Sequence, residues 1–345
     1  MTGAAAEAPP AGRLDVAALQ RWLAGRLPGC EAGLHVHRFP GGSSNPTYAL
    51  GAGGREYVLR KRPEGALSNS AHRVEREFRV MQALQGSGVP VPRVHLLCED
   101  SAVLGQSFYV MDRVPGRVHA DPAMPGCSPA QRRAAWDEMN AVLARLHAVD
   151  VRVIGLDDYG RPERYVARQL ERWLAQYRDA RTEDIPEMER LGAWLHDHAP
   201  RQARAALVHG DYRLGNLILA PDRPEVAAVL DWEMSTLGDP LCDLAYNCLC
   251  WHLRELPIGF QDADPGALGI PAEADYVESY RRRAGLAEIP HWTFYVAFSI
   301  FKIAVISQIN YRRALAGHAP ADSIEKKKYV ARRARLGWAL ASRGG

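Results

Sequence analysis

The sequence has little lysine and almost no net charge. Only five of its 43 Lys and Arg residues are lysine, and 40 Asp and Glu residues leave a net charge of +3 at pH 7. A protein that binds nucleic acid normally carries a clear excess of positive charge on one face. The charge balance therefore predicts no nucleic-acid partner.

The cysteines lack the spacing of a zinc site. None of the six forms a C-x-x-C pair, and no H-x₃₋₅-H pattern accompanies them; they are Cys30, Cys98, Cys127, Cys242, Cys248 and Cys250. Zinc sites normally show such pairs. Scattered cysteines in a chain of this length are typical of a reducing compartment, which predicts a cytoplasmic protein.

The sequence also lacks a long uninterrupted apolar run. Its most apolar stretch, residues 295–309, is shorter than a membrane span and contains Lys302. It predicts a buried helix and no membrane partner. The first residues, MTGAAAEAPPAGR, have neither a basic segment nor an apolar core. Residues 1–13 are therefore expected to be a disordered tail, not a signal peptide.

A chain of 345 residues is long enough to form two lobes. Its 47% hydrophobic and 24% charged residues are typical of a globular protein. Up to Met111, helical periodicity at 14–27 and 70–84 alternates with short strand-like pieces at 35–39, 47–50, 56–60 and 108–111. After the Val114-Pro115-Gly116 break, helical spacing dominates, at 129–147, 161–179 and 186–198. This predicts an α+β protein with a β-rich N-terminal lobe at 14–113 and a helical lobe at 114–345.

Acidic and amide side chains follow two short apolar runs of the second half. His209-Gly210-Asp211 comes after Leu207-Val208, Asn216 lies five residues further on, and Asp231 follows the run at 226–230. Mg²⁺ prefers such hard oxygen ligands and shares them with phosphate oxygens. We expect Asn216 and Asp231 to bind the metal. Asp211 can accept a proton from an attacking hydroxyl or orient it.

These motifs resemble those of a known family. H-G-D-x-x-x-x-N at 209–216 is similar to the catalytic loop H-R-D-x-x-x-x-N of protein kinases, and Asp231-Trp232-Glu233 stands in the place of the kinase D-F-G. The H-G-D form followed by D-W-E is the pattern of the aminoglycoside phosphotransferase family. The segments 57–63, 70–72 and 301–308 resemble the members associated with acyl-CoA dehydrogenases. The resemblance implies a bilobed protein-kinase-like fold and an enzyme that uses ATP and Mg²⁺.

The resemblance also implies where a nucleotide binds. The turn with Gly42, Ser43 and Ser44 stands in the place of the kinase phosphate loop, and Met111 begins the hinge against which the base would lie. Either Arg60 or Lys61 should contact the phosphates. Alternate strand residues face opposite sides, and the family pattern favours Arg60. Glu77, on the helix predicted at 70–84, should pair with that cation.

The sequence indicates less about the substrate that accepts the phosphoryl group than about the nucleotide. From residue 279 to the end there are thirteen basic and three acidic residues, which suits an anionic metabolite, for example a hydroxyacyl compound. The function predicted is ATP-dependent transfer of the γ-phosphoryl group to a hydroxyl of a small molecule. Two alternatives stay open: an antibiotic phosphotransferase, and an inactive kinase-like binding module. ATP versus GTP, and monomer versus homodimer, also stay open.

Overall fold

The structure is a computed structural model that describes residues 14–39, 45–63, 74–255, 257–317 and 321–343. The chain forms two compact units. The first contains Met1–Gly116 and Ala227–Met234, and the second contains Arg117–Val226 and Ser235–Gly345. The predicted tail at 1–13 lies outside the described residues. The boundary after residue 116 falls slightly later than the predicted one.

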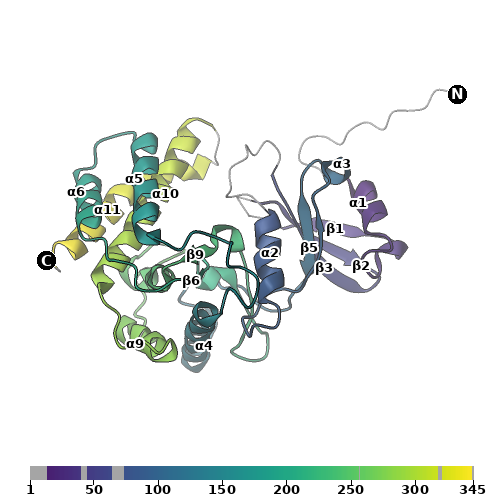
Figure 1. The fold of residues 1–345 in the computed structure, drawn as a ribbon, viewed down its shortest axis with the longest axis horizontal. Helices are drawn as coiled ribbons and strands as arrows, with labels where there is room; N and C mark the ends of the chain where they lie inside the picture. Colours follow the sequence, from purple (N-terminus) through teal and green to yellow (C-terminus); the bar gives the residue numbers. More distant parts are fainter. Residues whose placement is uncertain (1–13, 40–44, 64–73, 256, 318–320, 344–345) are drawn as a thin grey trace. The chain divides into compact units, whose positions relative to one another are not determined.

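The first unit contains a five-stranded antiparallel sheet with the strand order β1-β2-β3-β5-β4 (Figure 1). Its strands are β1 (His35–Arg38), β2 (Thr47–Ala52), β3 (Arg55–Lys61), β4 (Val94–Cys98) and β5 (Phe108–Asp112). Its helices are α1 (Val16–Leu23), η1 (Cys30–Ala32), α2 (Val74–Leu84), α3 (Ser101–Leu104) and η4 (Trp232–Met234).

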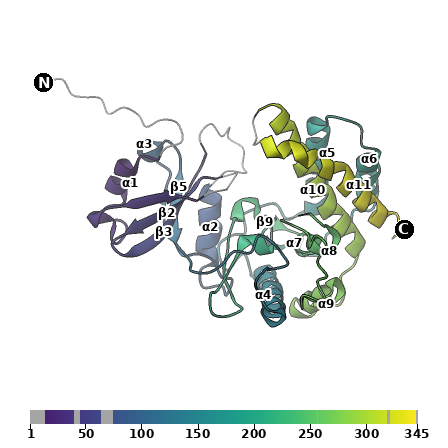
Figure 2. The same ribbon diagram turned by 180° about the vertical axis from the view of Figure 1, so that it is seen from behind.

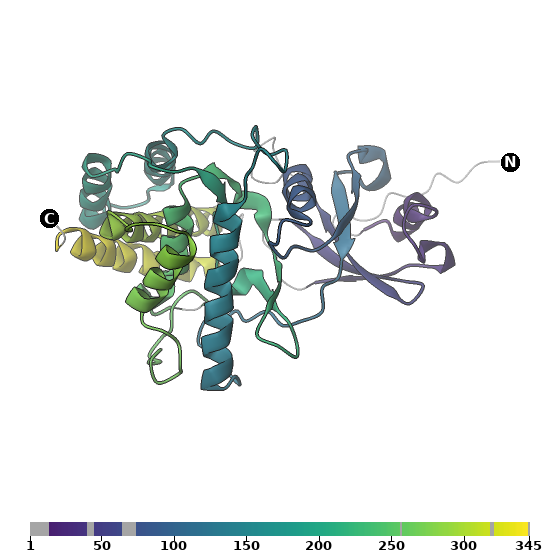
Figure 3. The same cartoon turned by 60° about the horizontal axis from the view of Figure 1, so that its bottom comes forward.

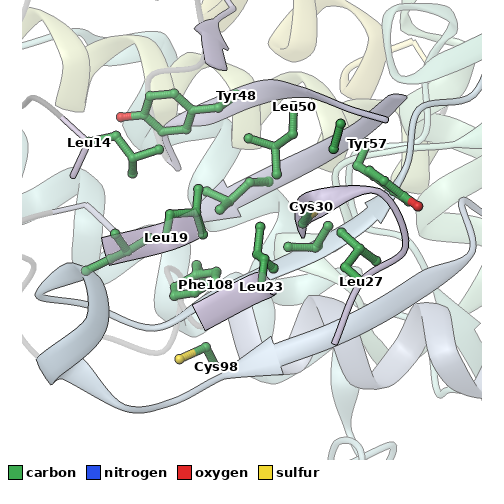
Figure 4. Close-up of a cluster of buried hydrophobic side chains, with 14 residues drawn as sticks. Leu14, Leu19, Leu23, Leu27, Cys30, Tyr48, Leu50, Tyr57, Cys98 and Phe108 are labelled. Atoms are coloured by element: carbon green, nitrogen blue, oxygen red, sulfur yellow. The ribbon is translucent and has the colours of Figure 1, made fainter. Parts of the chain in front are cut away.

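The sheet lies between α1 and α2 (Figures 1 and 2). Leu59, Phe108 and Val110 belong to an apolar cluster with Leu19 and Leu23 of α1. Figure 4 shows this cluster, with Phe108, Leu19 and Leu23 labelled. The residues that alternate with them, including Arg60 and Tyr109, contact α2 instead. The two faces of β3 and β5 therefore differ: one is apolar, and the other carries polar groups.

A late segment of the chain completes the first unit. The N–H of Val229 donates to the carbonyl of Pro90 at 2.9 Å, and the fully buried indole of Trp232 donates to the carbonyl of Val229 at 3.0 Å. The sequence places residues 227–234 in the second lobe, because they are remote in sequence from the sheet. These residues belong to the first unit because of their tertiary contacts, and a local sequence pattern does not show such contacts.

The second unit is mainly helical and is built around α10 (Trp292–Leu315), which packs against α5, α6, α7 and α11 (Figure 3). Its other helices are α4 (Pro129–Ala148), α5 (Tyr165–Ala180), α6 (Pro186–Asp197), α7 (Pro240–Asn247), α8 (Leu249–His252), α9 (Glu273–Arg283), α11 (Lys327–Ala341), η3 (Leu214–Asn216) and η5 (Ala321–Lys326). Its short strands are β6 (Ala206–Val208), β7 (Leu217–Leu219) and β9 (Thr236–Gly238), while β8 (Val226–Val229) runs from Val226 of this unit into the segment that belongs to the first unit. β6 pairs with β9.

Helix α10 is longer than the apolar run that predicts it. Its 24 residues are long and apolar enough to cross a membrane by length and composition, which corrects the expectation of a stretch too short to span. Most of its apolar window, 72%, is buried inside the protein. That burial is typical of the core helix of a globular unit. The prediction of a buried helix is therefore confirmed.

The other predicted helices are present with shifted ends. α1 is shorter than the predicted 14–27; its N-cap Asp15 accepts the N–H of Ala18 at 2.9 Å, and a turn follows Leu23. α2 is described from Val74, so the predicted helix start at residue 70 lies outside the described residues.

Candidate active site

The loop from His209 to Asn216 connects β6 to η3 and β7 in the second unit. It begins with a backbone turn at Gly210, whose φ of +84° lies in the left-handed region that favours glycine. His209 is fully buried, and its Nδ1 accepts the N–H of Asp211 at 3.2 Å. His209 therefore helps to fix the conformation of the loop. Asp211 follows this turn, shortly after β6 ends at Val208.

Asp243, in the first turn of α7, fixes the backbone at His209 and Gly210. Its carboxylate accepts the N–H of His209 at 2.5 Å and that of Gly210 at 2.8 Å. Burial alone would raise the pKa of Asp243, but the hydrogen bond and charge of His147 outweigh burial and lower it. Through these two backbone contacts, Asp243 supports the loop.

Asp211 and Asn216 contact each other directly. The Nδ2 of Asn216 lies 2.8 Å from Oδ2 of Asp211 and 2.9 Å from the Asp211 carbonyl. Both bonds use the amide nitrogen of Asn216, so its carbonyl oxygen is the atom that could bind a metal. Nε of Arg213 is 3.5 Å from the same Asp211 oxygen. The Asp211 side chain, 22% exposed, is thus oriented without being enclosed.

The first unit holds a second polar cluster, centred on Arg60. Its Nε lies 2.9 Å from Oε2 of Glu77, and its Nη2 lies 2.5 Å from Oδ1 of Asp231 and 3.7 Å from Oε2 of Glu233. Burial opposes the charge on Arg60, but the carboxylates of Glu77 and Asp231 outweigh it and raise its pKa. Arg60 is therefore a fixed cation.

The register of β3 decides between Arg60 and Lys61. Arg60 faces α2 and makes the ion pair with Glu77 that the sequence predicts for the phosphate-binding cation. Lys61 alternates with it on the side of Leu59 and is only 7% exposed. Lys61 is therefore a buried residue and not a solvated surface charge.

Sequence reasoning missed two residues that hold Glu77. The Nδ2 of Asn45 donates to Oε1 of Glu77 at 2.7 Å, and the hydroxyl of Tyr109 donates to Oε2 at 3.0 Å. Glu77 is 1% exposed, and burial raises its pKa, while Arg60 lowers it. Asn45 ends the small-residue turn that the sequence singles out. The predicted Gly42, Ser43 and Ser44 lie outside the described residues.

Met111 and Asp231 stand at the ends of their strands. Met111 is the second-last residue of β5, pairs with Val58 of β3, and is 8% exposed. Asp231 follows β8 with a φ of +66°, a conformation that is uncommon for a residue other than glycine. Non-glycine residues held in this region often serve function.

The chemistry of the donors suits a magnesium ion. Asp231 offers a carboxylate whose side chain is 31% exposed, and Asn216 offers an amide oxygen. These are the hard oxygen ligands that Mg²⁺ takes. Among the residues that the structure describes, no group of three or more His, Cys, Asp and Glu side chains could hold a metal ion. Mg²⁺ commonly keeps several water molecules and binds through one or two carboxylates together with substrate phosphates.

Comparisons with known proteins place the chain. A family model described as the phosphotransferase enzyme family matches residues 35–286. Acyl-CoA dehydrogenase family member 10 of Mus musculus is 46% identical over 333 residues, which are 95% of this chain and 31% of that protein. The chain thus spans less than a third of that relative's length.

Solved structures agree with the family match. The crystal structure of a candidate aminoglycoside phosphotransferase from Ralstonia eutropha JMP134 has a TM-score of 0.86 at 44% identity, covering 96% of this chain and 99% of that one. A spectinomycin phosphotransferase solved with ADP and spectinomycin has a TM-score of 0.63 at 13% identity, covering 95% and 98%, and shows the fold alone.

The predicted protein-kinase-like α+β fold and the resemblance to members associated with acyl-CoA dehydrogenases are confirmed. The family match spans most of the chain, from the first strand of the sheet to the end of α9. The chain belongs to the phosphotransferase enzyme family.

Proposed function

We propose that the protein transfers the γ-phosphoryl group of ATP to a hydroxyl group of a small molecule. The observation that carries the proposal is the Asp211–Asn216 contact at 2.8 Å, on a loop that Asp243 holds by two backbone N–H groups. A carboxylate fixed next to an amide ligand is the arrangement that orients a hydroxyl beside a metal-bound phosphate.

Each polar group has a separate task in this proposal. Asp211 accepts or orients the proton of the acceptor hydroxyl. Asn216 and Asp231 would hold Mg²⁺, which, when bound, neutralises charge on the phosphates. Arg60, fixed by Glu77, contacts the phosphates of ATP through a charge-assisted bond. The base would lie against the segment that follows Met111.

The acceptor is proposed to be a hydroxylated acyl compound. The support is the similarity to acyl-CoA dehydrogenase family member 10. The basic C-terminal residues support it less than the sequence suggests, because several are already paired. Arg283 contacts Asp137, Lys327 contacts Glu183, and Arg333 contacts Glu255.

The test is an acceptor screen with purified protein, Mg²⁺ and ATP. ADP release is measured against hydroxyacyl-CoA thioesters, aminoglycosides and amino alcohols, and ³¹P NMR identifies a phosphate monoester in the product. We expect a hydroxyacyl compound to stimulate ADP release, and Asp211→Asn to abolish the stimulation. If no acceptor stimulates the wild type above the Asp211→Asn variant, the kinase-like binding module becomes the better interpretation.

An antibiotic acceptor is the second candidate. The Ralstonia structure, at 44% identity, is described as that of a candidate aminoglycoside phosphotransferase. Aminoglycosides are polycations, so their binding requires acidic side chains around the acceptor. The aminoglycoside arm of the screen decides: stimulation by these compounds alone would replace the hydroxyacyl proposal and keep the phosphotransfer chemistry.

A further inference from the structure

Lys302 is a partly buried lysine that reaches the catalytic loop from helix α10. It lies in the segment 301–308 that the sequence analysis singles out, and the proposed mechanism gives it no task. Its Nζ donates to the carbonyl oxygen of Gly210 at 2.5 Å. This contact joins α10 to the residue directly before Asp211, 92 positions earlier in the chain.

The peptide groups on both sides of Gly210 are thereby held. Its N–H donates to Asp243 at 2.8 Å, and its carbonyl accepts from Lys302. Gly210 has no side chain to restrict rotation, and its φ is +84°. The carbonyl of Gly210 belongs to the peptide bond that leads into Asp211. A bond to that carbonyl therefore fixes the plane from which the Asp211 side chain projects.

Burial makes a charge on Lys302 costly. Its Nζ lies 4.4 Å from the ring centroid of Tyr246 and 5.9 Å from that of Trp173. Burial lowers the pKa of Lys302, and the charges of Asp211 and Asp243 oppose this effect. An apolar residue would fill the same space without desolvating a cation. The position therefore indicates a task that needs a donor.

We propose that Lys302 is a positioning residue: it fixes the Gly210 carbonyl and so sets the orientation of Asp211 for phosphoryl transfer. The inference rests on the proposed function. A positioning role predicts a different effect of mutation from a role in packing alone. A lost positioning contact should slow the chemical step, because small displacements of reacting groups cost large factors in rate. It should leave ATP binding unchanged, because Arg60 and Glu77 belong to the other unit.

The test compares Lys302→Met, which keeps length but removes the donor, with Gln308→Met on the same helix. Gln308 is buried and donates to the carbonyl of Ala180 and the hydroxyl of Thr182, both at 2.9 Å, so its loss is a matched structural change. Lys302→Leu, which also removes the donor, is a second variant if the methionine variant does not fold. Each variant is measured for kcat, ATP KM, thermal unfolding, and hydrogen exchange of the amides of residues 209–213.

We expect the folded Lys302 variants to lose roughly tenfold or more in kcat with ATP KM within about twofold of wild type. Hydrogen exchange at 209–213 should rise. Gln308→Met should lower the stability of the protein but leave kcat and the hydrogen exchange at 209–213 unchanged. A wild-type kcat in a folded Lys302 variant, or an equal loss of kcat in Gln308→Met, overturns the inference. If the wild type has no Asp211-dependent activity, the proposed function fails, and unchanged exchange at 209–213 separately rejects the role of Lys302.

Discussion

At the scale of single residues, Asp211 makes the sharpest prediction. Asp211→Asn keeps the size of the side chain and a partner for Asn216, but removes the charge that accepts or orients a proton. We expect turnover to fall by roughly 10²-fold or more, the loss typical of a missing general base. The affinity for ATP, measured by calorimetry, should stay within about threefold of wild type. A variant with wild-type turnover would remove Asp211 from the mechanism.

Arg60 and Lys61 separate nucleotide binding from packing. Arg60→Ala removes the partner of Glu77 and the proposed phosphate contact. A lost bond to a charged group costs about 1.5–3 kcal/mol, so the ATP KM should rise roughly 10- to 150-fold. Lys61→Met, on the opposite face of β3, is the matched control and should leave the ATP KM unchanged. The reverse pattern would contradict the assignment of the cation.

Arg60 and Lys61 show how much of the site can be predicted from the sequence alone. The pattern V-L-R-K identifies the strand and limits the cation to two neighbours. It cannot choose between them from strand period alone, because the two faces of β3 are distinguished only by what packs on them. α1 covers the Lys61 side and α2 the Arg60 side. The same reason hides Tyr109, whose hydroxyl meets Glu77 across sequence-distant elements.

At the scale of elements, the start of α7 supports the catalytic loop. Asp243→Asn keeps one acceptor oxygen for two buried N–H groups, those of His209 and Gly210. We expect a loss of about 1–3 kcal/mol in the free energy of unfolding at pH 7, measured by urea denaturation. Asp262→Asn is the control, because its carboxylate is 94% exposed and pairs only at the surface with Arg254. It should change stability by about 0.5 kcal/mol or less.

The same pair of variants carries a pH prediction. The folded-state pKa of Asp243 lies below its usual value, so its charge stabilises the fold above the unfolded pKa of about 3.9. That contribution is lost as the pH falls through the lower folded pKa. The stability gap between wild type and Asp243→Asn should therefore be constant above about pH 5 and narrow below about pH 4. A gap that widens in acid would contradict this sign.

Elements with strong local signals were predicted well, and tertiary assignments were not. Helical periodicity finds α4, α5 and α6 within a few residues, since Ser128 and the prolines Pro129 and Pro186 mark helix starts. Asp239 followed by Pro240 is likewise a local signal for a helix start, and Asp239 is the N-cap of α7, where it accepts the N–H of Leu241 at 3.0 Å. It does not show that residues 227–234 join the first unit, because that depends on Pro90 and α2.

At the scale of the whole molecule, the proposed metal ligands come from different units. Asn216 belongs to the second unit, while Asp231 belongs to the short segment that completes the first. The two residues also contribute differently, because Asp231 brings a negative charge and Asn216 brings none. Asp231 should dominate the binding of a divalent cation.

Thermal unfolding tests this dependence on metal. Mg²⁺ with ATP at about 100 times its Kd should stabilise the wild type by about 2.7 kcal/mol, and ATP with excess EDTA should not. Asp231→Asn suits the residue's φ of +66° better than alanine would, so it removes the charge with little backbone strain. We expect it to lose the Mg²⁺-dependent stabilisation. Asp222→Asn, an exposed carboxylate in the loop after β7, has the same charge change and should keep it. Equal stabilisation of Asp231→Asn and wild type, or equal Mg·ATP affinity by calorimetry, would exclude Asp231 as a metal ligand.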